Sequence, residues 1–187
     1  MRQLLFGVCR LCAQRSLRRA FAFSIPTAPI LSLWSIARGG GKTHILRTLG
    51  VIERGIILIF IPLLTLSADV MHKFEECNPT WGNVGMYHLN ELYDCNRQLY
   101  HSLLSGCTLL GRDTSSTFFI FLSPQFLINH RDALYVFVSC AHKRMLRVIA
   151  MDEAHIHVQH GTLFREDICA LRIEFIRKVY GDQPRGL

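Results

Sequence analysis

The first 52 residues of the chain contain no aspartate or glutamate, although they contain eight lysine and arginine residues. The other 135 residues carry 13 basic and 14 acidic side chains, so the formal net charge of +7 comes from the N-terminal part alone. The body of the protein is therefore close to neutral. Bulk charge gives no ground for a nucleic-acid-binding function.

The chain also lacks the paired cysteine motifs of a zinc ribbon. Its seven cysteines are odd in number and irregularly spaced, and Cys9 and Cys12 form a single C-x-x-C motif. We therefore expect most cysteines to be reduced thiols that act as small core residues. No charge lies between Arg19 and Arg38, but prolines and hydroxyl side chains make this 18-residue stretch a poor spanning helix. We expect no transmembrane span.

The basic, acid-free N-terminus divides the chain into parts. We assign residues 1–29 to a leader, 30–182 to one folded domain, and 183–187 to a C-terminal tail. The arginine-rich leader is similar to an organelle transit peptide, which would direct the protein to a mitochondrion or plastid. The alternative interpretation is a basic tail that does not take part in folding.

Apolar runs at 30–36, 55–61, 84–87, 118–122 and 147–151 predict buried strands. Helical spacing of apolar residues follows at 43–49, 63–74, 89–104, 133–142 and 165–179, and Gly106 is expected to end the third of these helices. Buried strands that alternate with helices predict an α/β fold with a parallel sheet.

A glycine-rich turn lies between the first predicted strand and the first predicted helix. Gly39, Gly40 and Gly41 leave backbone N–H groups free to approach phosphate oxygens. Lys42 supplies an ammonium group for the β and γ phosphates, and Thr43 supplies a hydroxyl for magnesium. The alternative is a flexible glycine loop that happens to precede these two residues.

An acidic pair ends the strand predicted at 147–151. Asp152 is a candidate magnesium ligand, and Glu153 is a candidate to polarise the water that attacks the γ-phosphate. One alternative is a loop with solvated carboxylates. Another is a metal site that includes His155, His157 and His160, although this spacing matches no strong zinc pattern.

Five segments in order resemble the first RecA-like domain of RecQ-type DNA helicases, within the DEAD/DEAH-box enzymes of superfamily 2. Residues 37–43 (Ala-Arg-Gly-Gly-Gly-Lys-Thr) resemble the family's phosphate loop, and 55–70 resemble its next motif. Residues 121–125 (Phe-Leu-Ser-Pro-Gln) are similar to its Thr-Pro-Glu segment, and 152–155 (Asp-Glu-Ala-His) to its ATPase motif. The RecQ-type loop is matched by Gln159, Gly161, Phe164 and Arg165.

The resemblance implies a P-loop NTPase of the RecA-like, three-layer type, with a mainly parallel sheet and a single incomplete lobe. It implies ATP and Mg²⁺ as cofactors, with Thr43 and Asp152 as magnesium ligands. It also implies contact with single-stranded or duplex DNA, with RNA left open, a nuclear location and a role in DNA recombination or repair. The implied nucleic-acid contacts are Ser123, Pro124, Gln159, Phe164 and Arg165.

The chain departs from the family pattern at several positions. His160 replaces a tryptophan of the RecQ-type loop, which weakens base stacking worth about 1–3 kcal/mol per base. Arg38 replaces a threonine beside the phosphate turn, and no glutamine stands at the usual adenine-recognition position. We expect no unwinding without a second RecA-like lobe, supplied by further sequence or by another chain. The alternative function is a non-catalytic P-loop remnant that binds nucleotide or a protein.

Overall fold

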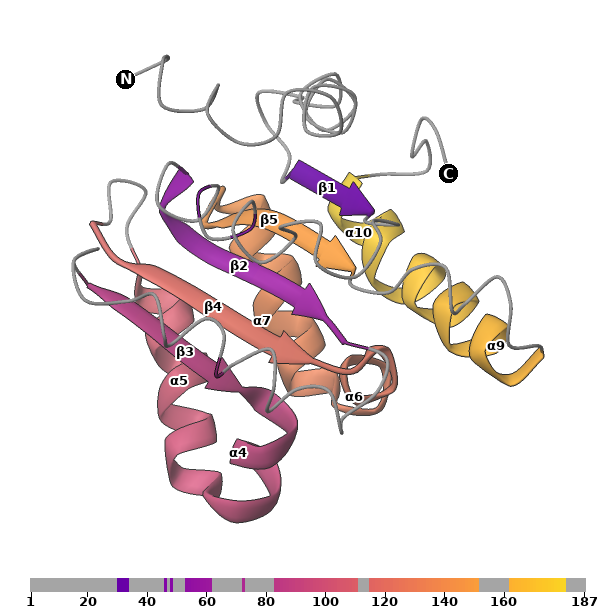
Figure 1. Cartoon of the computed structure of the whole chain (residues 1–187), viewed down its shortest axis with the longest axis horizontal. Coiled ribbons are helices and arrows are strands. Elements are labelled where there is room, and N and C mark those ends of the chain that lie inside the picture. The colour runs from indigo at the N-terminus through magenta and orange to yellow at the C-terminus, as the bar shows by residue number, and fades with distance from the viewer. Residues whose placement is uncertain are drawn as a thin grey trace.

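The computed structural model describes residues 30–33, 46, 48, 53–61, 72, 83–110, 115–151 and 162–180. Five strands lie in one sheet: Ile30–Leu33 (β1), Gly55–Phe60 (β2), Val84–His88 (β3), Thr117–Leu122 (β4) and Leu146–Met151 (β5). Their order is β1-β5-β2-β4-β3, and every neighbouring pair is parallel (Figure 1). The predicted α/β fold with a parallel sheet is confirmed.

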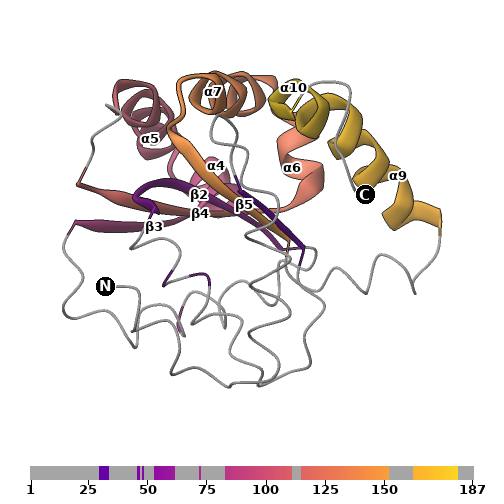
Figure 2. The ribbon, with the colours of Figure 1, turned by 90° about the horizontal axis from the view of Figure 1, so that it is seen from above.

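Helices follow the strands on one side of this sheet. They are Leu89–Cys95 (α4), Arg97–Leu109 (α5), Pro124–Asn129 (α6), Arg131–His142 (α7), Thr162–Leu171 (α9) and Arg177–Tyr180 (α10), with a π-helical turn at Arg172–Ile176 (η3) between the last two. Seen from above, all of these helices lie over the same face (Figure 2). Crossover connections between parallel strands usually contain an α-helix, so these helices agree with the alternation seen in the sequence.

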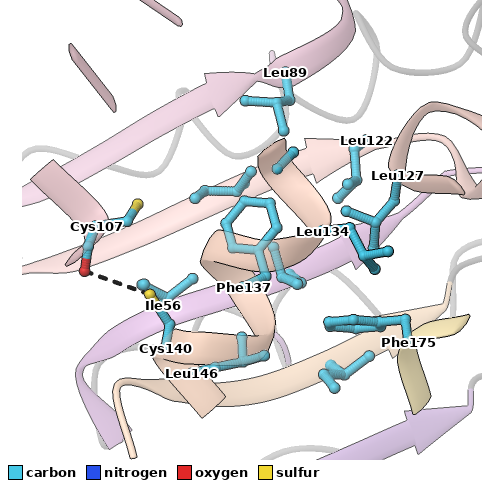
Figure 3. Packing of buried hydrophobic residues seen from close by; sticks show 14 of the residues in the cluster. Ile56, Leu89, Cys107, Leu122, Leu127, Leu134, Phe137, Cys140, Leu146 and Phe175 are labelled. Carbon is cyan, nitrogen blue, oxygen red and sulfur yellow. Dashed lines mark hydrogen bonds between the residues drawn. The ribbon is translucent and has the colours of Figure 1, made fainter. Parts of the chain in front are cut away.

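The apolar core under these helices is continuous from α5 to η3. Figure 3 shows Leu134 and Phe137 of α7 beside side chains of the sheet, with Phe175 of η3 at one end. Phe175 meets Phe60, the last residue of β2, edge to face at 6.2 Å between ring centroids. The final helical segment is thereby anchored to the carboxyl end of a central strand.

The cysteine prediction is confirmed for two residues and wrong for two others. Cys107 of α5 and Cys140 of α7 are buried, and the Cys140 thiol donates to the Cys107 carbonyl oxygen at 3.5 Å (Figure 3). Burial raises the pKa of Cys107 to about 12 and that of Cys140 to about 11, so both stay protonated. Cys95 and Cys169 are exposed thiols.

The other face of the sheet buries a second apolar cluster. Its members are Ile57, Ile59, Ile61, Phe119, Phe121, Val148, Ala150 and the helical residue Leu46. Strand β2 contributes to both clusters and is buried along its whole length, as the unbroken apolar run predicts for a strand covered on two faces.

The single helix predicted at 89–104 is wrong. Asn96 interrupts it with non-helical backbone angles (φ −148°, ψ 79°), and its side chain accepts from the Leu99 N–H at 3.0 Å, which caps the start of α5. Helix α5 then continues through Gly106 to Leu109. Gly106 does not end the helix because a glycine inside a helix costs only about 1 kcal/mol relative to alanine.

Residues with positive φ lie at the amino edge of the sheet, where the parallel strands begin. Just after α7, Arg144 has φ 62°, and the N–H groups of Arg144 and Met145 donate back to the Ala141 and Cys140 carbonyls in a Schellman motif. At the start of β2, Gly55 has φ +103°, and a Cβ there would lie 2.7 Å from the Met145 carbonyl oxygen. Only glycine fits this position.

Candidate nucleotide and nucleic-acid site

Strands β1 and β5 are neighbours, and this adjacency defines the first half of the candidate site. They pair in parallel from Ile30 and Val148 to Leu33 and Met151, so both strands end at the same level. Asp152 follows Met151 directly, and the glycine turn begins six residues after Leu33. The two predicted phosphate and magnesium motifs thus follow neighbouring strands at the carboxyl edge, where parallel α/β sheets bind ligands.

Most of the sequence-predicted side chains lie outside the described residues. These are Gly39, Gly40, Gly41, Lys42, Thr43, Asp152, Glu153 and Gln159, together with the alternative metal ligands His155, His157 and His160. The structure therefore brings together the strands that precede these motifs, while the geometry of the motifs stays a prediction.

Ser123 and Pro124 lie further along the same carboxyl edge. Strand β4 ends at Leu122, and Pro124 is the first residue of α6. The Ser123 hydroxyl caps α6 by accepting from the Phe126 N–H at 3.1 Å. The sequence predicts the end of the strand here but not the short helix that starts at once, because proline is favoured at a first helical position as well as in a turn.

Helix α9 carries two further predicted nucleic-acid contacts near its start. Phe164 and Arg165 are helical, within Thr162–Leu171, and their side chains lie outside the description. Helix α9 packs against α6. Ser123 and Pro124 are therefore on an element in direct contact with the helix that carries Phe164 and Arg165.

Asn90, which the sequence analysis did not identify, is bonded twice to Ser123. Its amide nitrogen donates to the Ser123 hydroxyl at 3.1 Å, and its amide oxygen accepts from the Ser123 backbone N–H at 3.1 Å. Both residues lie just beyond the ends of neighbouring parallel strands: Asn90 is the second residue after β3, and Ser123 is the first after β4. The sequence signal that could have identified this pair is a polar residue shortly after each of two predicted strands.

His88, at the end of β3, is buried in the same region with only 4% of its surface exposed. Among the described residues neither ring nitrogen has a hydrogen-bond partner, and the Glu91 carboxylate lies 3.5 Å from Nδ1. Desolvation lowers the pKa of His88, and Glu91 opposes this only in part. The imidazole is therefore neutral near pH 7.

An aromatic group holds α4 against α6. The Tyr93 ring meets Phe126 and His130 edge on, at 5.5 Å and 4.1 Å between centroids, and the Arg97 guanidinium lies 3.4 Å above it. Phe126 and His130 stack at 3.9 Å. Since α4 contacts α6 through Asn90 at its start and Tyr93 further along, the position of α6 is fixed by side chains from another element.

Comparison of the chain with protein-family models, curated proteins and solved structures gives no match. Within the described part of the chain, no three histidine, cysteine or acidic side chains converge as a metal site. No helix in that part is both long and apolar enough to cross a membrane.

Proposed function

We propose that this chain is the ATP-binding lobe of a RecQ-like DNA helicase, which binds Mg-ATP and contacts nucleic acid at one edge of a RecA-like sheet. The observation that carries the proposal is the parallel pairing of β1 with β5, which ends at Leu33 and Met151. A P-loop nucleotide site combines a phosphate loop with a separate acidic residue for Mg²⁺, and here both motifs follow strands that end at the same edge of the sheet.

The spacing of the strands supports this assignment. Neighbouring strands lie about 4.8 Å apart, so chains that leave β1 and β5 at the same level start within reach of one bound triphosphate. In the proposed site Gly39, Gly40 and Gly41 surround the phosphates, Lys42 neutralises their charge, and Thr43 and Asp152 hold Mg²⁺. Glu153 orients the attacking water. The bound magnesium supplies charge neutralisation on the phosphates.

The nucleic-acid part of the proposal uses the other end of the same edge. Ser123 and Pro124 follow β4, and Phe164 and Arg165 are on α9, which packs on α6. Together with Gln159 they form a proposed path for a DNA backbone. Strand β2 separates β4 from β5, so this path begins about 10 Å from the end of β5.

The second candidate function is a P-loop remnant that binds nucleotide or a protein without turnover. It is favoured by His160, which stands where the resembled loop has the tryptophan that stacks on DNA bases. A remnant that has kept its nucleotide site binds Mg-ATP as well, but it does not hydrolyse it.

Thermal unfolding with millimolar ATP and Mg²⁺ tests the nucleotide site. A ligand at a hundredfold excess over its Kd stabilises the folded state by about 2.7 kcal/mol, which is a readily measured rise in Tm. Lys42→Ala is expected to abolish the rise. The matched control is Lys143→Ala, an exposed lysine at the end of α7, which is expected to respond as the wild type does. Absence of protection in the wild-type protein would overturn the proposal.

A hydrolysis assay then separates the two candidates. The helicase lobe is expected to release phosphate from ATP, with Glu153→Gln retaining the magnesium-dependent rise in Tm while losing turnover. If neither the wild type nor Glu153→Gln releases phosphate faster than buffer alone, the non-catalytic remnant is the correct function.

A further inference from the structure

We propose that Asn90 is a positioning residue that prepares the Ser123 hydroxyl to donate a hydrogen bond to a nucleic-acid phosphate. This inference rests on the proposed function of the carboxyl edge. It concerns a residue outside the motifs that indicate that function.

The two hydrogen bonds between these residues leave Ser123 little freedom. Asn90 accepts from the backbone N–H and donates to the side-chain oxygen, both at 3.1 Å, so it fixes the peptide plane and the side-chain rotamer together. The partners are 33 residues apart in the chain. The clamp therefore also ties the junction between β3 and α4 to the junction between β4 and α6.

The contacts of the Ser123 hydroxyl show which of its hydrogen-bonding positions is unused. A serine hydroxyl has one donor and two acceptor positions. The two acceptor positions of Ser123 are used by Asn90 Nδ2 and by the Phe126 N–H. What remains is the O–H donor, and no described residue accepts from it. An acceptor-only ligand such as a phosphodiester oxygen satisfies this group, whereas a second donor does not.

Other contacts also hold α4 against α6, so the packing of these two helices does not depend on Asn90 alone. Tyr93, one turn further along α4, contacts Phe126 and His130 of the α6 region. Loss of the Asn90 amide is therefore expected to free the Ser123 rotamer while α6 stays on α4. The consequence is a binding defect larger than the accompanying loss of stability.

The chain offers a matched control in Asn96, six residues away. Asn96 also makes its contact through the side-chain oxygen, accepting from Leu99 N at 3.0 Å to cap α5, and it does not touch Ser123. Asn90→Ala and Asn96→Ala each remove a capping or clamping amide. Asn90→Asp and Asn96→Asp each add one negative charge to the same helical hairpin.

The decisive variant is Asn90→Asp. An aspartate still accepts from the Ser123 N–H, but it cannot donate to the hydroxyl, so the hydroxyl turns its proton toward the carboxylate. Binding of a fluorescein-labelled single-stranded oligothymidine, followed by anisotropy at fixed low salt, is expected to weaken about tenfold or more relative to Asn96→Asp. Asn90→Ala and Ser123→Ala are expected to lose affinity for the oligothymidine by similar factors. The variant that carries both substitutions is expected to lose no more affinity than either single variant.

Three outcomes decide the matter. Selective loss with Asn90→Asp and Asn90→Ala, and wild-type affinity with both Asn96 variants, supports the positioning role. If Asn90→Asp binds the oligothymidine as tightly as the wild type and Asn96→Asp do, the inference is wrong and the proposed function stands. A wild-type protein that gives Mg-ATP protection but no anisotropy change overturns the nucleic-acid part of the proposed function, and this inference with it.

Discussion

Replacing His88 with leucine is expected to stabilise the protein and to remove part of the dependence of its stability on pH. His88 is 4% exposed, and neither ring nitrogen has a hydrogen-bond partner in the part of the chain that the structure describes. An unsatisfied buried polar group costs about 1–3 kcal/mol, and leucine has a similar volume without that cost. The expected gain in the free energy of unfolding at neutral pH is about 1–2 kcal/mol.

The sign of the pH effect follows from the lowered pKa. Burial lowers the pKa of His88 below the unfolded value of 6.5. Between these two pKa values, the unfolded chain binds a proton that the folded state does not bind. The contribution of His88 to stability is therefore constant above pH 6.5 and falls as pH decreases through the window below it. The slope is at most about 1.4 kcal/mol per pH unit, which is the value for one proton.

Urea unfolding curves collected from about pH 8 to about pH 5 measure this effect. The wild type should lose stability relative to His88→Leu on acidification, and the difference should grow below pH 6.5. Glu91→Gln removes the carboxylate that favours the protonated ring, so it should lower the pKa of His88 further and extend the window to lower pH. Parallel curves for the wild type and His88→Leu, or a wild type that gains on acidification, would refute this account.

Three substitutions test the backbone and the core. Gly55→Ala forces a side chain onto φ +103° and within 2.7 Å of the Met145 carbonyl, so a loss of about 1–3 kcal/mol or more is expected in urea unfolding. Gly106→Ala, in helical backbone with no atom within 4 Å of the new Cβ, should instead gain about 0.5–1 kcal/mol. Tyr100→Phe removes a 2.8 Å hydrogen bond to Asp132 and should cost about 1–2 kcal/mol, whereas an unchanged unfolding midpoint would mean that this bond contributes nothing.

The sheet was predictable because its strands have strong one-dimensional signals. Six consecutive buried residues in β2 and four in β4 form the apolar runs that are typical of strands covered on both faces. The helix boundaries were harder, because Asn96 acts as a cap and Gly106 as an ordinary helical residue, and the same residue types occur in both roles. Tertiary packing of α5 on α7 decides between them, and spacing along the sequence does not contain that information.

The candidate site was predictable to the extent that it consists of residues directly after strands. Asp152 and Ser123 follow apolar runs, and parallel pairing then brings the ends of those runs to one edge. The roles of Asn90 and His88 were not predicted because they depend on three-dimensional surroundings. Asn90 bonds a hydroxyl 33 residues away, and His88 has no hydrogen-bond partner among the described residues. A side chain that orients another one leaves no spacing pattern, so the contact that governs Ser123 becomes visible only when the strand order brings β3 beside β4.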